Sequence, residues 1–151
     1  MSEENNIINI RKKLQGIQSS LKAPKGQTNK FGGYSYRSAE DILNAVKPLL
    51  NEWNCTLVLN DDMVMVGDRH YIKSIATLAD SDTDSFIHAQ AFAREAVIKK
   101  GMDEAQITGS ASSYARKYAL NALFAIDDTK DPDATNTHGK EQAKKIPSQG
   151  F

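Results

Sequence analysis

The chain has 151 residues, of which 40% are hydrophobic, and this suits one domain with its own core. Its 19 basic and 19 acidic residues cancel, which excludes a uniformly basic nucleic-acid-binding protein. The single cysteine, Cys55, excludes an intrachain disulfide and favours an intracellular setting. Because Cys55 lies between Trp53 and an apolar run, we expect a buried thiol. No apolar run approaches the roughly 20 residues of a membrane helix, and the N-terminus lacks the cationic start of a signal peptide, so we expect a cytoplasmic protein.

The neutral total conceals a segregated charge. Between residues 11 and 47, eight cations oppose two acids, a local charge of +6. The acids gather instead at Asp61–Asp62, at three aspartates between 80 and 84, and between residues 127 and 133. We therefore expect a basic surface opposite an acidic one.

The start of the chain predicts an N-terminal helix, because apolar residues recur there at alternating steps of three and four. These residues are Ile7, Ile10, Leu14, Ile17 and Leu21. The heptad-like seam can dock onto the domain's own core or pack against a neighbouring subunit, and its spacing leaves both open.

Prolines and glycines between Ala23 and Tyr36 predict a loop or a short hairpin. This segment and its flanks interleave cations with aromatic residues: Lys22, Lys25, Lys30, Phe31, Tyr34, Tyr36 and Arg37. Cations neutralise phosphates, and a ring offers any base a stacking face worth about 1–3 kcal/mol. The alternative is a surface loop whose aromatic residues cover the core. We favour that for Phe31, and favour nucleic-acid binding for Lys30, Tyr36 and Arg37.

A second helix follows, with Ser38 as its N-cap and Asp41 as the acidic partner of a capping box. Its buried stripe comprises Ile42, Leu43, Val46, Leu49 and Leu50. Pro48 lacks an N–H group, so we expect it to kink or shorten the last turns. This helix is interpreted as scaffold.

The hydrophobic period then changes to two, which predicts strands at 56–66, 69–79 and 85–95. Gly67-Asp68 joins the first two as a hairpin turn. In the third strand Ile87 and three alanines point to one face, where a helix can lie close. The expected unit is a three-stranded antiparallel meander covered by a helix.

The covering helix is expected from Gly109 to Asp128. One side carries mainly small apolar residues: Ala111, Ala115, Tyr118, Ala119, Ala122 and Ile126. The other side carries Ser113, Arg116, Lys117 and Leu120. The two cations can serve a polyanion or form only a solvated face, and helical spacing leaves both open.

These elements predict an α+β fold. It comprises an N-terminal helix, a capped helix and a three-stranded antiparallel β-meander packed by a long C-terminal helix. The domain covers residues 1–128. Residues 129–151 are polar and aperiodic, which predicts a flexible, disordered tail. A basic connector, Lys99–Lys100, leads toward the last helix.

Several kinds of chemistry find no support in the sequence. There is no G-x-x-x-x-G-K-[ST] motif for a P-loop ATPase. The histidines share no metal-ligand spacing with one another or with Cys55. The aspartates at 61 and 62, and those from 80 to 84, are interpreted as solvated turn residues. We therefore expect no enzyme, no catalytic residue, no metal and no cofactor.

Two motifs carry a resemblance to a known family. The run GMDEAQITGSASSYARKYALNALFAIDD, from Gly101 to Asp128, resembles the signature of the ERF (essential recombination function) family of phage single-strand annealing proteins. Upstream, Tyr36-Arg37-Ser38, Glu40-Asp41-Ile42 and Val46-Lys47-Pro48-Leu49-Leu50 resemble the family's first motif. The resemblance spans residues 7–128. It implies a β-β-β-α core, rings or filaments of identical subunits, and work in the cytoplasm of the infected bacterial host.

The resulting hypothesis is ATP-independent binding and annealing of single-stranded DNA in phage homologous recombination. The candidate DNA-binding residues are Lys25, Lys30, Tyr36, Arg37, Lys73, Arg94, Lys99, Lys100, Ser113, Arg116 and Lys117. Expected partners are single-stranded DNA, further copies of the chain, and a phage exonuclease or host single-strand-binding protein. Three alternatives stay open: a coating protein that does not anneal, a metal-dependent nuclease built on Asp61–Asp62 and Asp84, and an assembly protein that uses the 7–21 seam without nucleic acid.

Overall fold

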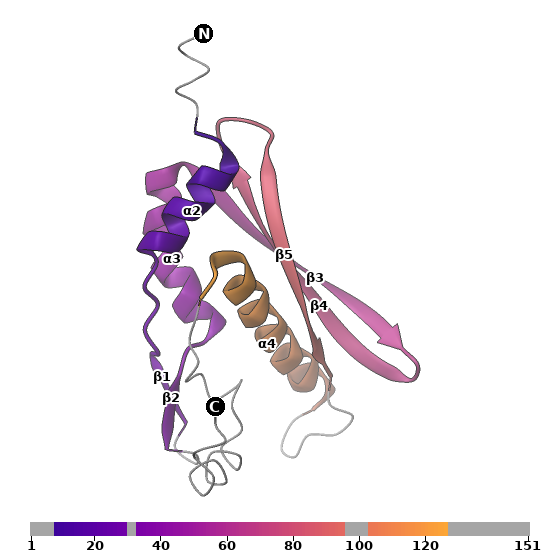
Figure 1. The fold of residues 1–151 in the computed structure, drawn as a ribbon. Coiled ribbons are helices and arrows are strands. Elements are labelled where there is room, and N and C mark those ends of the chain that lie inside the picture. The colour runs from indigo at the N-terminus through magenta and orange to yellow at the C-terminus, as the bar shows by residue number, and fades with distance from the viewer. Residues whose placement is uncertain (1–7, 30–32, 96–102, 127–151) are drawn as a thin grey trace, which may run out of the picture.

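The computed structural model describes residues 8–29, 33–95 and 103–126. In chain order the elements are α2 (Ile10–Ser20), β1 (Gln27–Asn29), β2 (Tyr34–Tyr36), α3 (Ala39–Trp53), β3 (Cys55–Val66), β4 (Arg69–Asp80), β5 (Phe86–Arg94) and α4 (Glu104–Phe124). Figure 1 shows α4 lying between the β3-β4-β5 sheet on one side and α2 with α3 on the other. The predicted α+β class, with a meander packed by the last helix, is confirmed.

The sheet has the predicted antiparallel order β3-β4-β5. Cys55 pairs with Asp80 at one end of the hairpin and Val66 with Arg69 at the other, so Gly67-Asp68 forms a two-residue turn. Gly67 has φ +63°, a left-handed conformation that favours glycine at this position. The alternation predicted for β5 is also present: Ile87 and the alanines at 89, 91 and 93 are half-buried, and the intervening residues are exposed.

Helix α4 begins earlier than expected. It spans Glu104–Phe124, and Gly109 lies inside it. Asp103 is the N-cap: its side chain accepts a hydrogen bond from the Gln106 N–H, and the Gln106 side chain accepts one from the Asp103 N–H. This reciprocal capping box outweighs the helix-breaking tendency of Gly109, so the predicted start at Gly109 is wrong.

The two sides of α4 are both covered, which the sequence pattern did not reveal. Ala111, Ala115 and Ala119 are buried toward the sheet, as predicted. Lys117 and Leu120, expected on the outward side, are 2% and 0% exposed, because α2 and α3 pack over that side. Ala122, expected to be buried, is exposed.

The apolar side of α2 packs against the rest of the domain, which was one of the two possibilities left open by its sequence. Ile10, Leu14 and Ile17 are buried in the main core cluster, together with Ile42 and Phe124 of other helices. The apolar side chains of α2 therefore pack against the core of the same chain. The assembly interpretation loses its basis, because these side chains are already covered.

Helix α3 begins where it was predicted to begin and continues past Pro48. Ser38 and Asp41 form the expected capping box, with the Asp41 N–H donating to the Ser38 hydroxyl at 3.1 Å. The helix runs through Pro48 to Trp53, so the expected shortening is wrong. Asn44 and Pro48 both face solvent, which lets water satisfy the carbonyl that Pro48 cannot.

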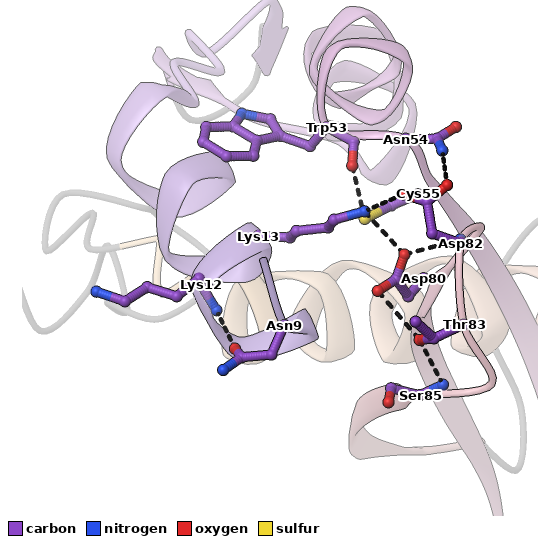
Figure 2. Close-up of polar contacts among 10 residues, drawn as sticks. All are labelled: Asn9, Lys12, Lys13, Trp53, Asn54, Cys55, Asp80, Asp82, Thr83 and Ser85. Atoms are coloured by element: carbon purple, nitrogen blue, oxygen red, sulfur yellow. Dashed lines mark hydrogen bonds and ion pairs between the residues drawn. The ribbon is translucent and has the colours of Figure 1, made fainter. Parts of the chain in front are cut away.

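A buried ion pair fastens α2 to the end of the sheet (Figure 2). The Lys13 ammonium lies 2.8 Å from Asp80 and 2.9 Å from Asp82. The side chains of Lys13 and Asp80 are only 7% and 1% exposed. Lys13 is thus withdrawn from the basic surface expected for residues 11–47, and Asp80 is not the solvated turn residue expected from the sequence. We call Lys13, Asp80 and Asp82 the Lys13 cluster.

Cys55 lies beside this cluster and is 7% exposed. Its thiol contacts the Trp53 carbonyl oxygen at 3.5 Å. Burial raises the pKa of the Cys55 thiol, so the thiolate is disfavoured. The predicted buried thiol is confirmed.

Acid is expected to weaken the fold through Asp80. The hydrogen bond from Lys13 holds the pKa of Asp80 below its ordinary value of 3.8. A carboxyl whose pKa is depressed in the folded state stabilises the fold fully above its unfolded pKa, and that stabilisation is lost as the pH falls through the folded value. Urea unfolding midpoints should therefore drop below about pH 4. Asp80→Asn, although less stable at neutral pH, should show a smaller drop.

Some predictions fall outside the described residues. These are Ile7, Lys30, Phe31, the Lys99–Lys100 connector and the 129–151 tail. Among the helices that are described, none combines the length and apolar character needed to cross a membrane.

Candidate nucleic-acid interface

A cavity of about 320 Å³ opens between the start of α3 and the outer part of α4. Its lining residues come from the β2–α3 junction and from α4: Tyr36, Arg37, Ser38, Ala39, Glu40, Leu43, Ser110, Ser113, Tyr114, Arg116 and Lys117. We call it the α3–α4 cavity. It brings together five of the sequence-predicted residues, namely Tyr36, Arg37, Ser113, Arg116 and Lys117, from segments that lie far apart in the chain.

Local structure explains how these side chains converge. Ser110, Ser113, Tyr114 and Lys117 recur at helical spacing, so they share one side of α4. The capping box at Ser38 fixes the angle at which α3 starts. Tyr36, the last residue of β2, lies two residues before the N-cap Ser38. The same capping box therefore helps to place Tyr36 opposite α4.

Arg116 is held by a carboxylate from the sheet. Its Nη2 lies 3.1 Å from the Asp61 carboxylate, and its Nε donates to the same group at 3.2 Å. The hydroxyls of Ser74 and Ser112 also donate to Asp61. The Arg116 side chain nevertheless stays 43% exposed and lines the cavity. A guanidinium that is oriented on one side and open on another is suited to a phosphate.

The position of Asp61 differs from the turn predicted from the sequence. It lies within β3, opposite Ser74, and not in a turn. Burial alone would raise the pKa of Asp61, but hydrogen bonds from Ser112, Ser74 and Arg116 outweigh burial and lower the pKa. The carboxylate is therefore ionised and anchors Arg116.

Lys117 does not form a solvated pair with Arg116. It is 2% exposed, and its ammonium lies 5.9, 5.7 and 5.5 Å from the ring centroids of Tyr36, Tyr114 and Tyr118. These distances are within the range of cation–π attraction. Lys117 thus holds tyrosines from β2 and α4 around one buried charge. The interpretation of both cations as one exposed face is wrong for Lys117.

Arg37 also combines two roles. It is 8% exposed, and its Nε donates to the Ala23 carbonyl, which ties the segment before β1 to the end of β2. It lines the cavity at the same time. Its positive charge therefore contributes to the cavity while its side chain stabilises the local fold.

Other predicted residues lie elsewhere. Lys25 precedes β1 and does not line the cavity. Lys73 and Arg94 lie on the face of the sheet that points away from α4, where Lys73 pairs with Phe92 and Arg94 with Tyr71. Lys30, Lys99 and Lys100 are outside the described residues. The structure therefore brings five of the predicted side chains to the cavity and leaves Lys25, Lys73 and Arg94 away from it.

Sequence reasoning missed three contributors: Tyr114, Glu40 and Asp61. Tyr114 shares the helical spacing of Lys117, so the pattern on α4 could have indicated it. Glu40 belongs to the upstream motif and was assigned to scaffold. The pairing of Asp61 with Arg116 spans 55 residues and depends on the tertiary packing.

Comparison with known proteins agrees with the family resemblance of the sequence. A family model described as the ERF superfamily matches residues 10–149, so the chain belongs to the ERF superfamily. The chain is similar to the Essential recombination function protein of Salmonella phage P22, with 53% identity over 130 residues. That match covers 86% of this chain and 61% of the relative, so the chain spans about three fifths of the relative's length. No solved structure matches the chain.

Proposed function

We propose that the chain binds single-stranded DNA and anneals complementary strands in phage homologous recombination, without ATP. Membership of the ERF superfamily and the name of the phage P22 relative support a role in recombination. The observation that carries the binding proposal is the α3–α4 cavity, where two tyrosines and three cations meet.

The chemistry is binding and positioning, without bond making. Arg116 contacts a backbone phosphate while Asp61 keeps its guanidinium in place. Arg37 adds positive potential from within the fold. Phosphate contacts of this kind are sequence-independent and weaken with salt. They leave most base edges exposed for a complementary strand.

Assembly and partners belong to the same proposal. Copies of the chain would line up their cavities along one strand, in a ring or a filament. A phage exonuclease would supply single strands, or a host single-strand-binding protein would hand them over. This work takes place in the cytoplasm of the infected bacterium. A protein that coats single strands without annealing them uses the same cavity, and a strand-pairing assay with two complementary oligonucleotides separates the two activities.

The nuclease alternative has lost its structural support. Asp61 and Asp62 are adjacent strand residues, so their side chains point to opposite faces of the sheet. Asp84 follows the far end of β4, about 20 Å from the strand position of Asp61. Within residues 8–29, 33–95 and 103–126, no three histidine, cysteine or acidic side chains are grouped to hold a metal ion.

Arg116→Ala is the direct test of the binding proposal. It should weaken binding of a single-stranded oligonucleotide about tenfold, since a hydrogen-bonded charged contact is lost. The slope of log affinity against log salt should become shallower by about 0.7. Fluorescence anisotropy across a salt series measures both.

Two variants make this test specific. Arg116→Lys keeps the charge and should retain most of the salt slope. Lys12→Ala removes an exposed cation from α2, away from the cavity, and should change affinity little. If Lys12→Ala weakens binding as much as Arg116→Ala, the site assignment is wrong. If the wild-type chain binds no oligonucleotide at low salt, the proposed function is wrong.

A further inference from the structure

We infer that the α3–α4 cavity accepts a single unpaired nucleobase, and that this makes the interface selective for single strands over duplex. The inference rests on the proposed function and adds a ligand to the cavity. Arg116 binds the backbone, and the neighbouring base enters the space beside Tyr36 and Tyr114.

The size of the cavity fits this ligand. Its volume of about 320 Å³ lies at the lower end of the range of roughly 300–1,000 Å³ for small-molecule pockets. One base with part of its sugar fits such a volume. A base pair does not, because its two bases and two backbones need a wider opening.

The walls carry the groups that a base requires. Tyr114 is 41% exposed, so one part of its ring remains accessible, and Tyr36 and Leu43 line the same space. Base–aromatic stacking tolerates every base, since each has a π-face. Ser113 and Glu40 are exposed polar residues on the lining, and hydroxyl and carboxylate groups can meet the polar edge of a base.

Lys117 orients the tyrosine rings that line the cavity and does not contact a phosphate. Its ammonium is within 6 Å of the ring centroids of both Tyr36 and Tyr114 while the residue is 2% exposed. A charge fixed beside two rings orients them. Lys117 is therefore a positioning residue.

Duplex is rejected for an energetic reason. A base in a duplex can enter only after it unpairs and unstacks, whereas a single strand offers its bases without that cost. When a complementary strand pairs with the bound strand, the base leaves the cavity, and the contact between that nucleotide and the cavity is lost. Selectivity for single strands and release of the product then follow from one site.

The test compares three ligands of equal length: oligo-dT, an abasic oligonucleotide with the same backbone, and a duplex. The wild-type chain should bind oligo-dT about tenfold more tightly than the abasic strand. Tyr114→Ala should reduce this preference to about one, and Tyr114→Phe, which keeps the stacking ring, should retain it. Arg116→Ala should weaken binding of both strands and leave their ratio unchanged.

The outcomes separate the inference from the function. If the wild-type chain binds and anneals single strands but holds the abasic strand as tightly as oligo-dT, the cavity binds phosphate and the inference fails while the function stands. If no strand is bound, the proposed function itself fails. Lys117→Met supplies an independent check, since it should lower the oligo-dT preference without changing the salt slope. A lowered slope would show that Lys117 is a phosphate contact.

Discussion

Lys13→Met is expected to lower the free energy of unfolding by about 3 kcal/mol. Removing the ammonium leaves the Asp80 carboxylate, whose side chain is 1% exposed, without its counterion. An uncompensated buried charge costs roughly 3–5 kcal/mol. The lower end applies because the Asp82 side chain is 57% exposed, so water reaches one edge of the cluster. Urea unfolding followed by circular dichroism measures the change.

Two controls isolate the charge. Lys12→Met alters the neighbouring, exposed residue of the same helix and should change stability by less than about 0.5 kcal/mol. Lys13→Met combined with Asp80→Asn removes both charges and should recover part of the loss. If the single Lys13→Met variant is as stable as the wild type, the pair does not stabilise the docking of α2.

Gly16→Ala should destabilise the chain by about 1–2 kcal/mol, although alanine is the better helix former. A Cβ atom at Gly16 would overlap the Cζ2 atom of the Trp53 indole, far inside van der Waals contact. The indole must therefore move, and overpacking of this kind exceeds the roughly 1 kcal/mol gained from helix propensity. Trp53 is the only tryptophan in the chain, so its fluorescence emission reports the displacement directly.

Gly109→Ala provides the matched comparison. Gly109 also lies inside a helix, but apart from its chain neighbours and the backbone of its own helix, no described atom comes within 4 Å of the position that its Cβ would occupy. This variant should gain up to about 1 kcal/mol and leave the Trp53 emission unchanged. Equal effects of the two substitutions would show that the contact between Gly16 and Trp53 has no influence on stability.

The sequence was most informative where a local rule decides the outcome. The period-two runs, the Gly67-Asp68 turn and the Ser38–Asp41 capping box all appear where they were predicted. Each depends on contacts within a few residues or on one buried face. The strand bounds are correct to within a residue for the same reason.

The sequence was least informative about side chains whose partners lie far away along the chain. A helix with one polar side suggested that Lys117 faces solvent, but α2 and α3 cover that side. The rings of three tyrosines lie within cation–π distance of the buried ammonium. The partners of Lys13 and Arg116 are 67 and 55 residues away along the chain. Spacing rules carry no information at that range, so these ion pairs had to be found in the structure.

The placement of α4 between two layers also bears on the synthesis of the protein. Tyr36 and Arg37 emerge from the ribosome long before Ser113 and Arg116, and the last helix must insert before the lining of the cavity exists. A nascent or truncated chain that ends at β5 therefore lacks half of that lining. The proposed affinity of this cavity for a single strand therefore arises only once translation has passed α4.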